Sequence, residues 1–304
     1  MHPTRRTFMT ALAGLPLLAG AGPLNPTGVR VVLLGTKGGP TPSPFRAAPA
    51  TLIEIGGRAW VVDCGNGVGR QLSMAGVSLD RLDRVFITHN HSDHVADVGN
   101  LIGLAWASGL KTPVTVHGPP PIKAIVHDQL AALAYDIAVR RQEERRVALA
   151  PLVHVEERST SGLVTRAGAV TVTSALVDHW TVKPAFAYRF DTPDRSIVIS
   201  GDTRYSEALV ALAKGADLLI HEALYVEAVP QATRENAPGL REHLLMSHTA
   251  TEDVGRVAER AGVKKLVLSH LVPVSPQITD DMWLAGVRKH FTGEAIVGRD
   301  LMEV

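Results

Sequence analysis

The sequence contains few of the residues that mark several classes of protein. It has one cysteine, Cys64, in 304 residues, so it cannot form an intramolecular disulfide and must be stabilised mainly by its core. It has no low-complexity segment and no short-period repeat, which excludes a solenoid. The content of 45% hydrophobic and 20% charged residues is typical of a soluble globular protein. Strand-like and helix-like segments alternate along the chain, which predicts an α/β fold.

The N-terminal apolar run is too short to span a membrane. In "TRRTFMTALAGLPLLAGAG", the pair Arg5-Arg6 precedes about a dozen apolar residues and a small-residue stop at 19–21. This pattern resembles a twin-arginine export signal. We therefore expect residues 1–21 to be a signal peptide and residues 22–304 to be one mature domain. The expected location is periplasmic or secreted, without membrane contact once the signal is removed.

The sequence also lacks an excess of basic residues. The chain has 31 Lys and Arg against 30 Asp and Glu, and removing residues 1–21 takes away two arginines and no acidic residue. A protein that grips nucleic acid by its phosphates usually carries a clear basic excess. The basic cluster "RRQEERR" at 140–146 is diluted by two glutamates. We therefore expect no nucleic-acid partner.

Two common catalytic loops are missing as well. Ser200 in "SGDTR" lacks the glycine-flanked elbow of a serine hydrolase. The glycine-rich "LGTKGGPTP" lacks the Walker pattern of a nucleotide-binding loop, and we expect it to be a turn that lines the site. The chemistry must therefore come from another group of residues.

That group is concentrated in "FITHNHSDHVAD". The apolar run "RVFITH" predicts a buried strand, and residues two apart on an extended chain project the same way, so His89 and His91 can reach one ion. Asp93 and His94 begin the helical pattern "SDHVADVGNLIGLAWAS", with Ser92 as the expected cap, and point toward a neighbouring ion. Histidines with a carboxylate suit zinc or a similar divalent metal.

Four ligands do not complete two metal sites, so further ligands must follow. His179, Asp202 and His270 each end an apolar strand pattern, which is where α/β folds build sites. Gly201 allows close backbone approach beside Asp202. These three residues are the candidates that complete the two coordination spheres.

The order of these motifs resembles the metallo-β-lactamase-fold hydrolases. The resemblance is carried by "VVDCGNG", "THNHSDH", "VDHW", "SGDTR", "LIHEALY" and "SHTATEDVGRVAERAGVKKLVLSH". It implies a four-layer αββα sandwich with two divalent ions, zinc being expected, at one edge. It also implies that one ion is held by His89, His91 and His179, the other by Asp93, His94 and His270, and both by Asp202. Asp63 matches an aspartate that orients the ligand loop. A hydroxide shared by the two ions would be the nucleophile.

The C-terminal motifs resemble a branch that contains transfer-RNA 3′-processing ribonucleases and arylsulfatase-like enzymes. In this branch a histidine matching His248 assists the leaving group, and His248 and Asp93 are the expected catalytic residues. The ribonucleases insert a long arm between the positions of His179 and Asp202, whereas only 22 residues separate them here. We therefore expect a small anionic ester as substrate, with aryl sulfate esters favoured. The alternatives are a phosphodiesterase, a lactone or β-lactam hydrolase, and a non-catalytic metal-binding module, which His248 argues against.

The remaining candidates concern the surroundings of the metals. Arg46 and Lys37 could meet the anionic ester, and Trp106, Tyr135 and Trp180 could stack on an aromatic leaving group, with core packing as the alternative for each. His221 could hydrogen-bond near the ligands. Residues 119–146 predict a helical stretch that is either a lid or an outer-layer helix. The sequence leaves the oligomeric state open, a homodimer included.

Overall fold

A computed structural model describes residues 28–229 and 237–304 of the chain. The signal peptide expected at residues 1–21 lies outside the described residues. In the described part, no helix is both long enough and apolar enough to cross a bilayer.

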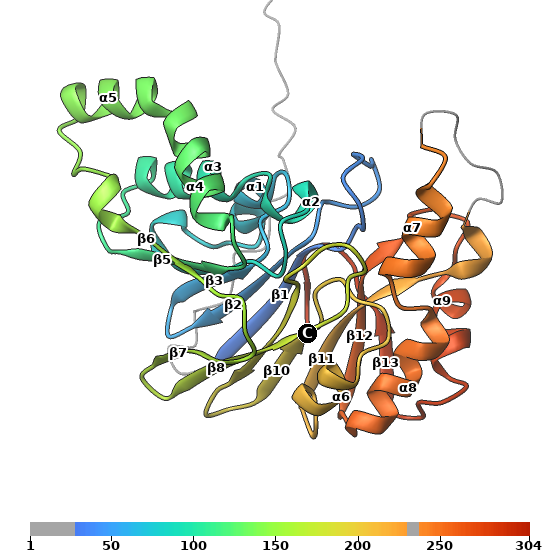
Figure 1. Ribbon diagram of the computed structural model, residues 1–304. Coiled ribbons are helices and arrows are strands. Elements are labelled where there is room, and N and C mark those ends of the chain that lie inside the picture. Colours follow the sequence, from blue (N-terminus) through green and yellow to red (C-terminus); the bar gives the residue numbers. More distant parts are fainter. Residues whose placement is uncertain (1–27, 230–236) are drawn as a thin grey trace, which may run out of the picture.

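Two seven-stranded mixed sheets form the centre of the molecule (Figure 1). The first sheet has the order β14 (Met302–Glu303), β1 (Val29–Gly35), β2 (Ala50–Ile55), β3 (Arg58–Val62), β4 (Leu82–Phe86), β5 (Val114–Gly118) and β6 (Val153–Glu157). The second has the order β13 (Glu294–Val297), β12 (Lys265–Val272), β11 (Leu218–Leu224), β10 (Ser196–Ile199), β9 (Phe186–Asp191), β8 (Val170–Leu176) and β7 (Gly162–Ala167). The first half of the chain therefore builds one sheet and the second half builds the other, except that β14 returns to pair with β1.

The sheets pack face to face because their inward residues are large and apolar. This middle core contains aromatic residues from both sheets, among them Phe86 of the first sheet and Phe190 of the second. Their ring centroids lie 5.1 Å apart with an interplanar angle of 89°, an edge-to-face contact that contributes about 0.5–1.5 kcal/mol beyond burial. The parallel strands β10, β11 and β12 are apolar on both faces, as expected for strands covered on both sides.

Helices cover the outer face of each sheet. The described helices are α1 (Val68–Met74), α2 (Ser92–Val95), α3 (Val98–Ala107), α4 (Ile122–Ala132), α5 (Ala134–Glu143), α6 (Glu207–Leu212), α7 (Leu240–Ser247), α8 (Thr251–Ala261) and α9 (Asp280–Val287), with short 3₁₀ turns at Leu79–Arg81, Ala150–Leu152 and Val226–Ala228. Helix α8 shows why they pack there: Val254, Val257, Ala258 and Ala261 recur at helical spacing and are buried. The predicted four-layer αββα sandwich is confirmed.

The structure corrects the prediction for the helix at Ser92 and distinguishes the two alternatives for residues 119–146. The helix predicted from Ser92 is split in two, because the amide of Asp97 donates to the carbonyl of Cys64 and its carboxylate accepts the amide of Gly67. Ser92 is the first residue of α2 rather than its cap, which is His91. Residues 119–146 form α4 and α5 in the outer layer of the first sheet (Figure 1), and helix α5 buries none of its residues. The described structure therefore favours the outer-layer alternative over a lid.

Candidate metal centre

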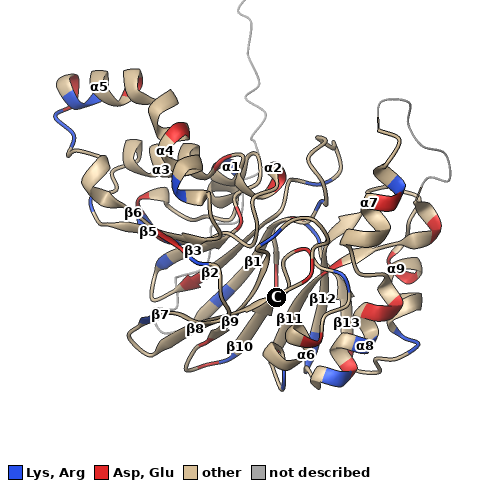
Figure 2. Cartoon of the chain, viewed as in Figure 1, with Lys and Arg blue, Asp and Glu red and all other residues tan. Residues whose placement is uncertain are grey.

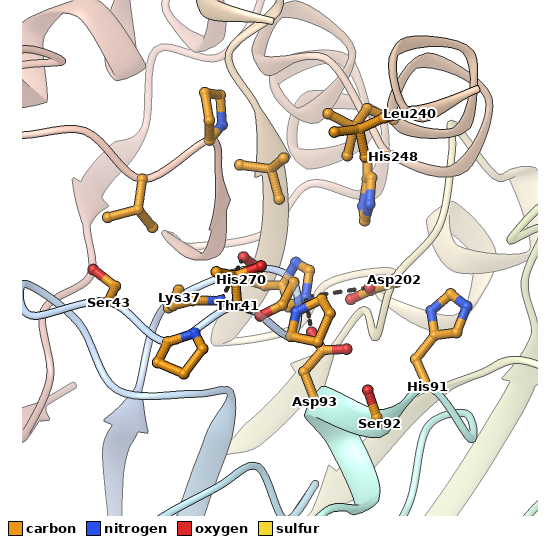
Figure 3. A pocket seen from close by; sticks show the side chains of 18 of the residues that line it. Lys37, Thr41, Ser43, His91, Ser92, Asp93, Asp202, Leu240, His248 and His270 are labelled. Carbon is orange, nitrogen blue, oxygen red and sulfur yellow. Dashed lines mark hydrogen bonds and ion pairs between the residues drawn. The ribbon is translucent and has the colours of Figure 1, made fainter. Parts of the chain in front are cut away.

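The candidate ligands lie at one edge of the sandwich, where strands of both sheets end (Figure 3). His89 and His91 follow β4, and Asp93 and His94 lie on α2, so this group comes from the first sheet. The second sheet contributes His179 after β8, Asp202 after β10 and His270 within β12. The structure thus brings together all seven residues that the sequence selected.

Asp202 lies between two groups of ligands. Single ligand atoms of His89, His91, His179 and Asp202 lie within 4.8 Å of one another, and so do those of Asp93, His94 and His270. The Asp202 Oδ2 atom is 3.8 Å from the Nε2 of His89 and 4.0 Å from that of His179. The same oxygen is 3.4 Å from the Nε2 of His94 and 3.2 Å from that of His270. This position is the one that a carboxylate bridging two ions requires.

Hydrogen bonds at the outer nitrogens orient three of the rings. The Nδ1 of His89 is 3.1 Å from the hydroxyl of Thr88, and the Nδ1 of His179 is 2.9 Å from the carbonyl of Ser247. The Nδ1 of His94 is 2.8 Å from a carboxylate oxygen of Asp63. Such outer contacts leave the inner Nε2 free to bind a metal.

Asp63 is held in a strained conformation to make its contact. Its φ of 61° is in the left-handed region, which is unusual for a residue with a side chain. Its carboxylate accepts the amide and the hydroxyl of Thr88 in addition to facing His94. Gly201 beside Asp202 has a φ of 58°, and a Cβ there would lie 2.6 Å from the carbonyl oxygen of Phe186. The close approach expected at this glycine is confirmed.

The donor set fits divalent metal ions. The Nε2 of His89 and the Oδ1 of Asp202 are buried and have no hydrogen-bond partner among the described residues. Unpartnered buried polar atoms are costly unless something binds them. Burial lowers the pKa of His89 and His179, so their rings are neutral. Burial raises the pKa of Asp93 and Asp202, but the adjacent histidines outweigh it and keep both carboxyls ionised. Burial lowers the pKa of His94, but Asp202, Asp63 and Asp93 outweigh burial and raise it well above its ordinary value, so this ring must lose its proton when a metal ion binds. Neutral imidazoles with ionised carboxylates are the ligand forms that zinc binds.

A cavity of about 530 Å³ opens above this cluster. Its floor includes His91, Asp93, Asp202 and His270, and its walls come from the segment 37–45, from α7 and from residues 272–274 (Figure 3). No residue of 119–146 lines it, although all of these residues are described. The walls are largely proline and aliphatic side chains, so one small group of a substrate can be held there away from bulk water.

His248 faces the cavity and is paired with a carboxylate that sequence reasoning missed. The Nδ1 of His248 is 3.3 Å from the Oε2 of Glu222, while the other oxygen of Glu222 accepts the amides of Thr203 and Thr249. Burial lowers the pKa of His248, but Glu222 more than offsets this and raises it to about 9.

His221, which the sequence placed near the ligands, contacts the backbone carbonyl of Glu222 instead. Its Nε2 has no partner among the described residues. Side chains alternate along β11, so Glu222 points to the opposite face of the strand from His221. This alternation was the feature of the sequence from which Glu222 could have been identified.

The residues proposed from their type as substrate contacts mostly make other contacts in the structure. Lys37 lines the cavity, but its ammonium donates to the carbonyls of Gly38 and Gly39. Arg46 donates to Thr36 and to the carbonyl of Gly298. Trp106 is in the core with its indole on the carbonyl of Val147. Tyr135 is 84% exposed on α5.

Trp180 alone among the expected aromatic contacts is near the centre. Its ring lies 6.0 Å from that of His243, a cavity residue for which the sequence gave no signal.

Comparison with known proteins agrees with this geometry. The β-lactamase superfamily domain matches residues 58–271. Ribonuclease Z of Mycobacterium bovis (strain BCG / Pasteur 1173P2) is 33% identical over 279 residues, which are 91% of this chain and 98% of that protein. Human tRNase Z, short form, superposes with a TM-score of 0.65 at 22% identity over 90% of this chain and 98% of that one. Zn²⁺-bound PqqB from Methylobacterium extorquens gives a TM-score of 0.64 at 16% identity over 90% and 99%.

These findings correct several predictions. The exclusion of nucleic acid in favour of a small-molecule ester is wrong, because the relative matched over almost its whole length is a ribonuclease. The periplasmic or secreted location is wrong on the same ground, and the segment meant to direct it lies outside the described residues. The arylsulfatase-like part of the resemblance finds no support, whereas the ribonuclease-like part does.

The enzyme class and cofactor predicted from the sequence are confirmed at the level of the family. The expected cofactor, two divalent ions with zinc favoured, agrees with the cluster of histidines and aspartates and with the superfamily that matches residues 58–271. The family follows from two findings, the β-lactamase superfamily match over residues 58–271 and the 33% identical relative. The chain belongs to the β-lactamase superfamily and is a metal-dependent hydrolase of the metallo-β-lactamase fold with ribonuclease Z as a relative.

Proposed function

We propose that this protein is a metal-dependent phosphodiesterase that cleaves RNA. The observation that carries the proposal is the position of Asp202 between the two ligand groups, with His248, which is paired with Glu222, lining the same cavity. A scissile phosphate there would lie between the ligand cluster and a proton donor. The 33% identity to ribonuclease Z across 98% of that protein supports RNA as the substrate.

Each group of side chains has a role in this proposal. His89, His91 and His179 would hold one ion, Asp93, His94 and His270 would hold the other, and Asp202 would bind both. Two such ions, when bound, lower the pKa of a water molecule and stabilise negative charge on the phosphate.

His248 donates a proton to the oxygen that leaves, since a ribose alkoxide is a poor leaving group without one. Glu222 keeps the imidazole protonated and oriented, and two backbone amides hold Glu222 in turn. Residues 22–304 act as a single hydrolase domain.

RNA would bind at the cavity, where Lys37 is the only Lys or Arg among the described residues of the lining. Figure 2 shows basic and acidic residues interspersed over the elements, α5 included. Arg140 of α5, for example, is paired with Asp136 and Glu144. Recognition would therefore depend on the cavity and its ions more than on a basic patch, and RNA binding should vary less steeply with salt than it does for proteins with many phosphate contacts.

The test measures cleavage of a labelled precursor transfer RNA that carries a 3′ extension. The zinc-loaded protein should cut it at one position, Asp202→Ala should not, and the exposed-site control His127→Ala should behave as wild type. Bis(p-nitrophenyl) phosphate should turn over faster than p-nitrophenyl sulfate. Preferential turnover of the sulfate with no RNA cleavage would overturn the proposal.

A second substrate separates this mechanism from that of metal-independent ribonucleases. Because the nucleophile is water, a precursor with a single 2′-deoxynucleotide at the cut position should still be cleaved. Loss of cleavage on that substrate would make the neighbouring 2′-hydroxyl the nucleophile and would contradict the roles assigned to the ligand cluster.

A further inference from the structure

We infer that the segment 36–39, at the end of β1, positions the candidate ligand His270 through the backbone of Gly38. His270 differs from the other ligands in how its ring is supported. The outer nitrogens of His89, His94 and His179 have polar contacts, whereas the Nδ1 of His270 is buried and has no partner among the described residues. The hydrogen bonds of this ring are on its inner side, from Nε2 to Asp93 and His94, so its outer side must be supported by packing.

Regular strand pairing does not fix the orientation of the His270 ring either. Glu222 of β11 is opposite Ser269 and Ala223 is opposite Leu271, so His270 is an extra residue in its strand. Its φ of 42° is in the left-handed region, as in a bulge where glycine is usual. The bulge turns the side chain toward the cluster but leaves its ring rotation free.

Gly38 covers the ring at close range. A Cβ atom on Gly38 would lie 2.8 Å from the Nδ1 of His270, 2.9 Å from its Cε1 and 2.3 Å from a methyl carbon of Val272. These distances are shorter than van der Waals contact. Val272 is β-branched and buried, so its methyl group cannot easily rotate away. Only glycine lets the backbone rest against the imidazole at this point.

Several hydrogen bonds prevent the segment from receding. The amide of Gly38 donates to the carbonyl of Leu271, and the amide of Leu271 donates to the carbonyl of Thr36, at 3.1 and 2.9 Å. The buried ammonium of Lys37 donates to the carbonyl of Gly38 at 3.0 Å and to that of Gly39.

Thr36 is fixed at the other end of the segment. Its amide and hydroxyl donate to the carboxylate of Asp300, and Arg46 donates to its hydroxyl. Lys37 and Arg46, expected from the sequence to contact substrate, thus hold the segment that holds a ligand.

Loss of the support from Gly38 should lower the metal affinity of only one of the two sites. His270 groups with Asp93 and His94, and also with Asp202 and His248, whereas the group of His89, His91 and His179 does not include it. A methyl group at position 38 would overlap both Val272 and the His270 ring. Hydrogen bonds hold the segment and Val272 is buried and β-branched, so we expect the ring to be displaced. Removing an outer support of a metal ligand typically costs about 10–100-fold in metal affinity. Gly38→Ala should therefore weaken one of two zinc equivalents by this factor and leave the other unchanged.

The experiment is a zinc titration of metal-stripped protein against a chromophoric chelator. Wild type should take up two equivalents, and Gly38→Ala should bind the first normally and the second about 10–100-fold more weakly. Gly39→Ala is the neighbouring control: its φ of 82° strains an alanine, a cost that position 38 does not carry, but a Cβ there meets nothing within 4 Å. Both of its equivalents should bind as in wild type.

A second variant keeps the test decisive if Gly38→Ala does not fold, which thermal melting of the stripped protein will reveal. Lys37→Met removes the ammonium that holds the two carbonyls without adding volume beside the ring, and it should weaken the same equivalent. Two normal equivalents in the folded variants would overturn the inference. Equal weakening of both equivalents would also overturn it, because the segment would then be a general scaffold. Neither result depends on which ester the enzyme cleaves.

Discussion

Replacing Glu222 with glutamine tests the proton donor without changing the shape of the site. One oxygen of Glu222 accepts the amides of Thr203 and Thr249 at 3.3 and 2.8 Å, and a glutamine carbonyl can accept both. The amide nitrogen would then face the Nδ1 of His248, where the charged oxygen now lies at 3.3 Å. The fold should persist, while the charge that stabilises the imidazolium is lost.

The size of the effect follows from the pKa of His248. Burial lowers this pKa, and Glu222 outweighs burial and raises it to about 9. Without the carboxylate the pKa should return at least to the ordinary value of about 6.5. At pH 8 the protonated fraction would then fall from about nine-tenths to about 3%, which is roughly thirtyfold. Because the protonated ring is the donor, cleavage of RNA at pH 8 should slow by about that factor and recover as the pH is lowered.

The assay compares two substrates that differ in the leaving group. RNA releases an alkoxide and needs the proton, whereas bis(p-nitrophenyl) phosphate releases a nitrophenolate that departs unprotonated. Glu222→Gln should therefore slow RNA cleavage much more than nitrophenyl release, with zinc content unchanged. Equal losses on the two substrates would refute the donor role and point to electrostatic stabilisation of the transition state. A loss of zinc would instead make the pair part of the metal site.

Three other substitutions probe the site and the fold. Asp202→Ala should reduce zinc from about two equivalents to at most one by elemental analysis, and two retained equivalents would remove its bridging role. Asp63→Asn should move the His94 proton to its Nε2 and weaken zinc about 10–100-fold in a chelator titration, whereas wild-type affinity would show that Asp63 does not set the tautomer. Burial, with Arg84 and Arg158 nearby, lowers the pKa of His117 to about 4. The unfolded chain therefore takes up this proton first as the pH falls below about 6.5, which costs up to about 3 kcal/mol by pH 4. His117→Gln should flatten that part of the unfolding free energy measured in urea, and an unchanged slope would contradict the assignment.

The clustering of the candidate ligands was predictable because their positions follow from strand periodicity and from the ends of strands. His89, His179 and Asp202 all close apolar runs, and such runs end at one edge of a sandwich. Their grouping needed the family resemblance, since spacing does not say which ligand joins which ion. Asp63 was likewise identified by its motif, while its left-handed φ became visible only in the structure.

The surrounding residues were not predictable from their type. Lys37 and Arg46 are cations near an anion site, yet backbone carbonyls and Thr36 take up their donors. Trp106 and Tyr135 are aromatic, yet one is in the core and the other is on an exposed helix. Glu222 was overlooked beside the more conspicuous His221.

The prediction of no nucleic-acid partner, which was drawn from the net charge, was wrong for a related physical reason. Net charge sums charges over the whole surface and omits the cations that the site itself holds, so it says little about local attraction of a phosphate. Function in this case depended on the arrangement of a few buried groups.

The division of the sandwich between the two halves of the chain affects how the protein is made. When the ribosome has synthesised β1 to β6, His89, His91, Asp93 and His94 are present, but Asp202, His270 and the last strand of the first sheet, β14, are not. Asp300, which anchors Thr36, comes later still. Zinc arriving early would meet an incomplete set of ligands, so a mature centre can be loaded only after residue 300 has been made and the second sheet has docked on the first.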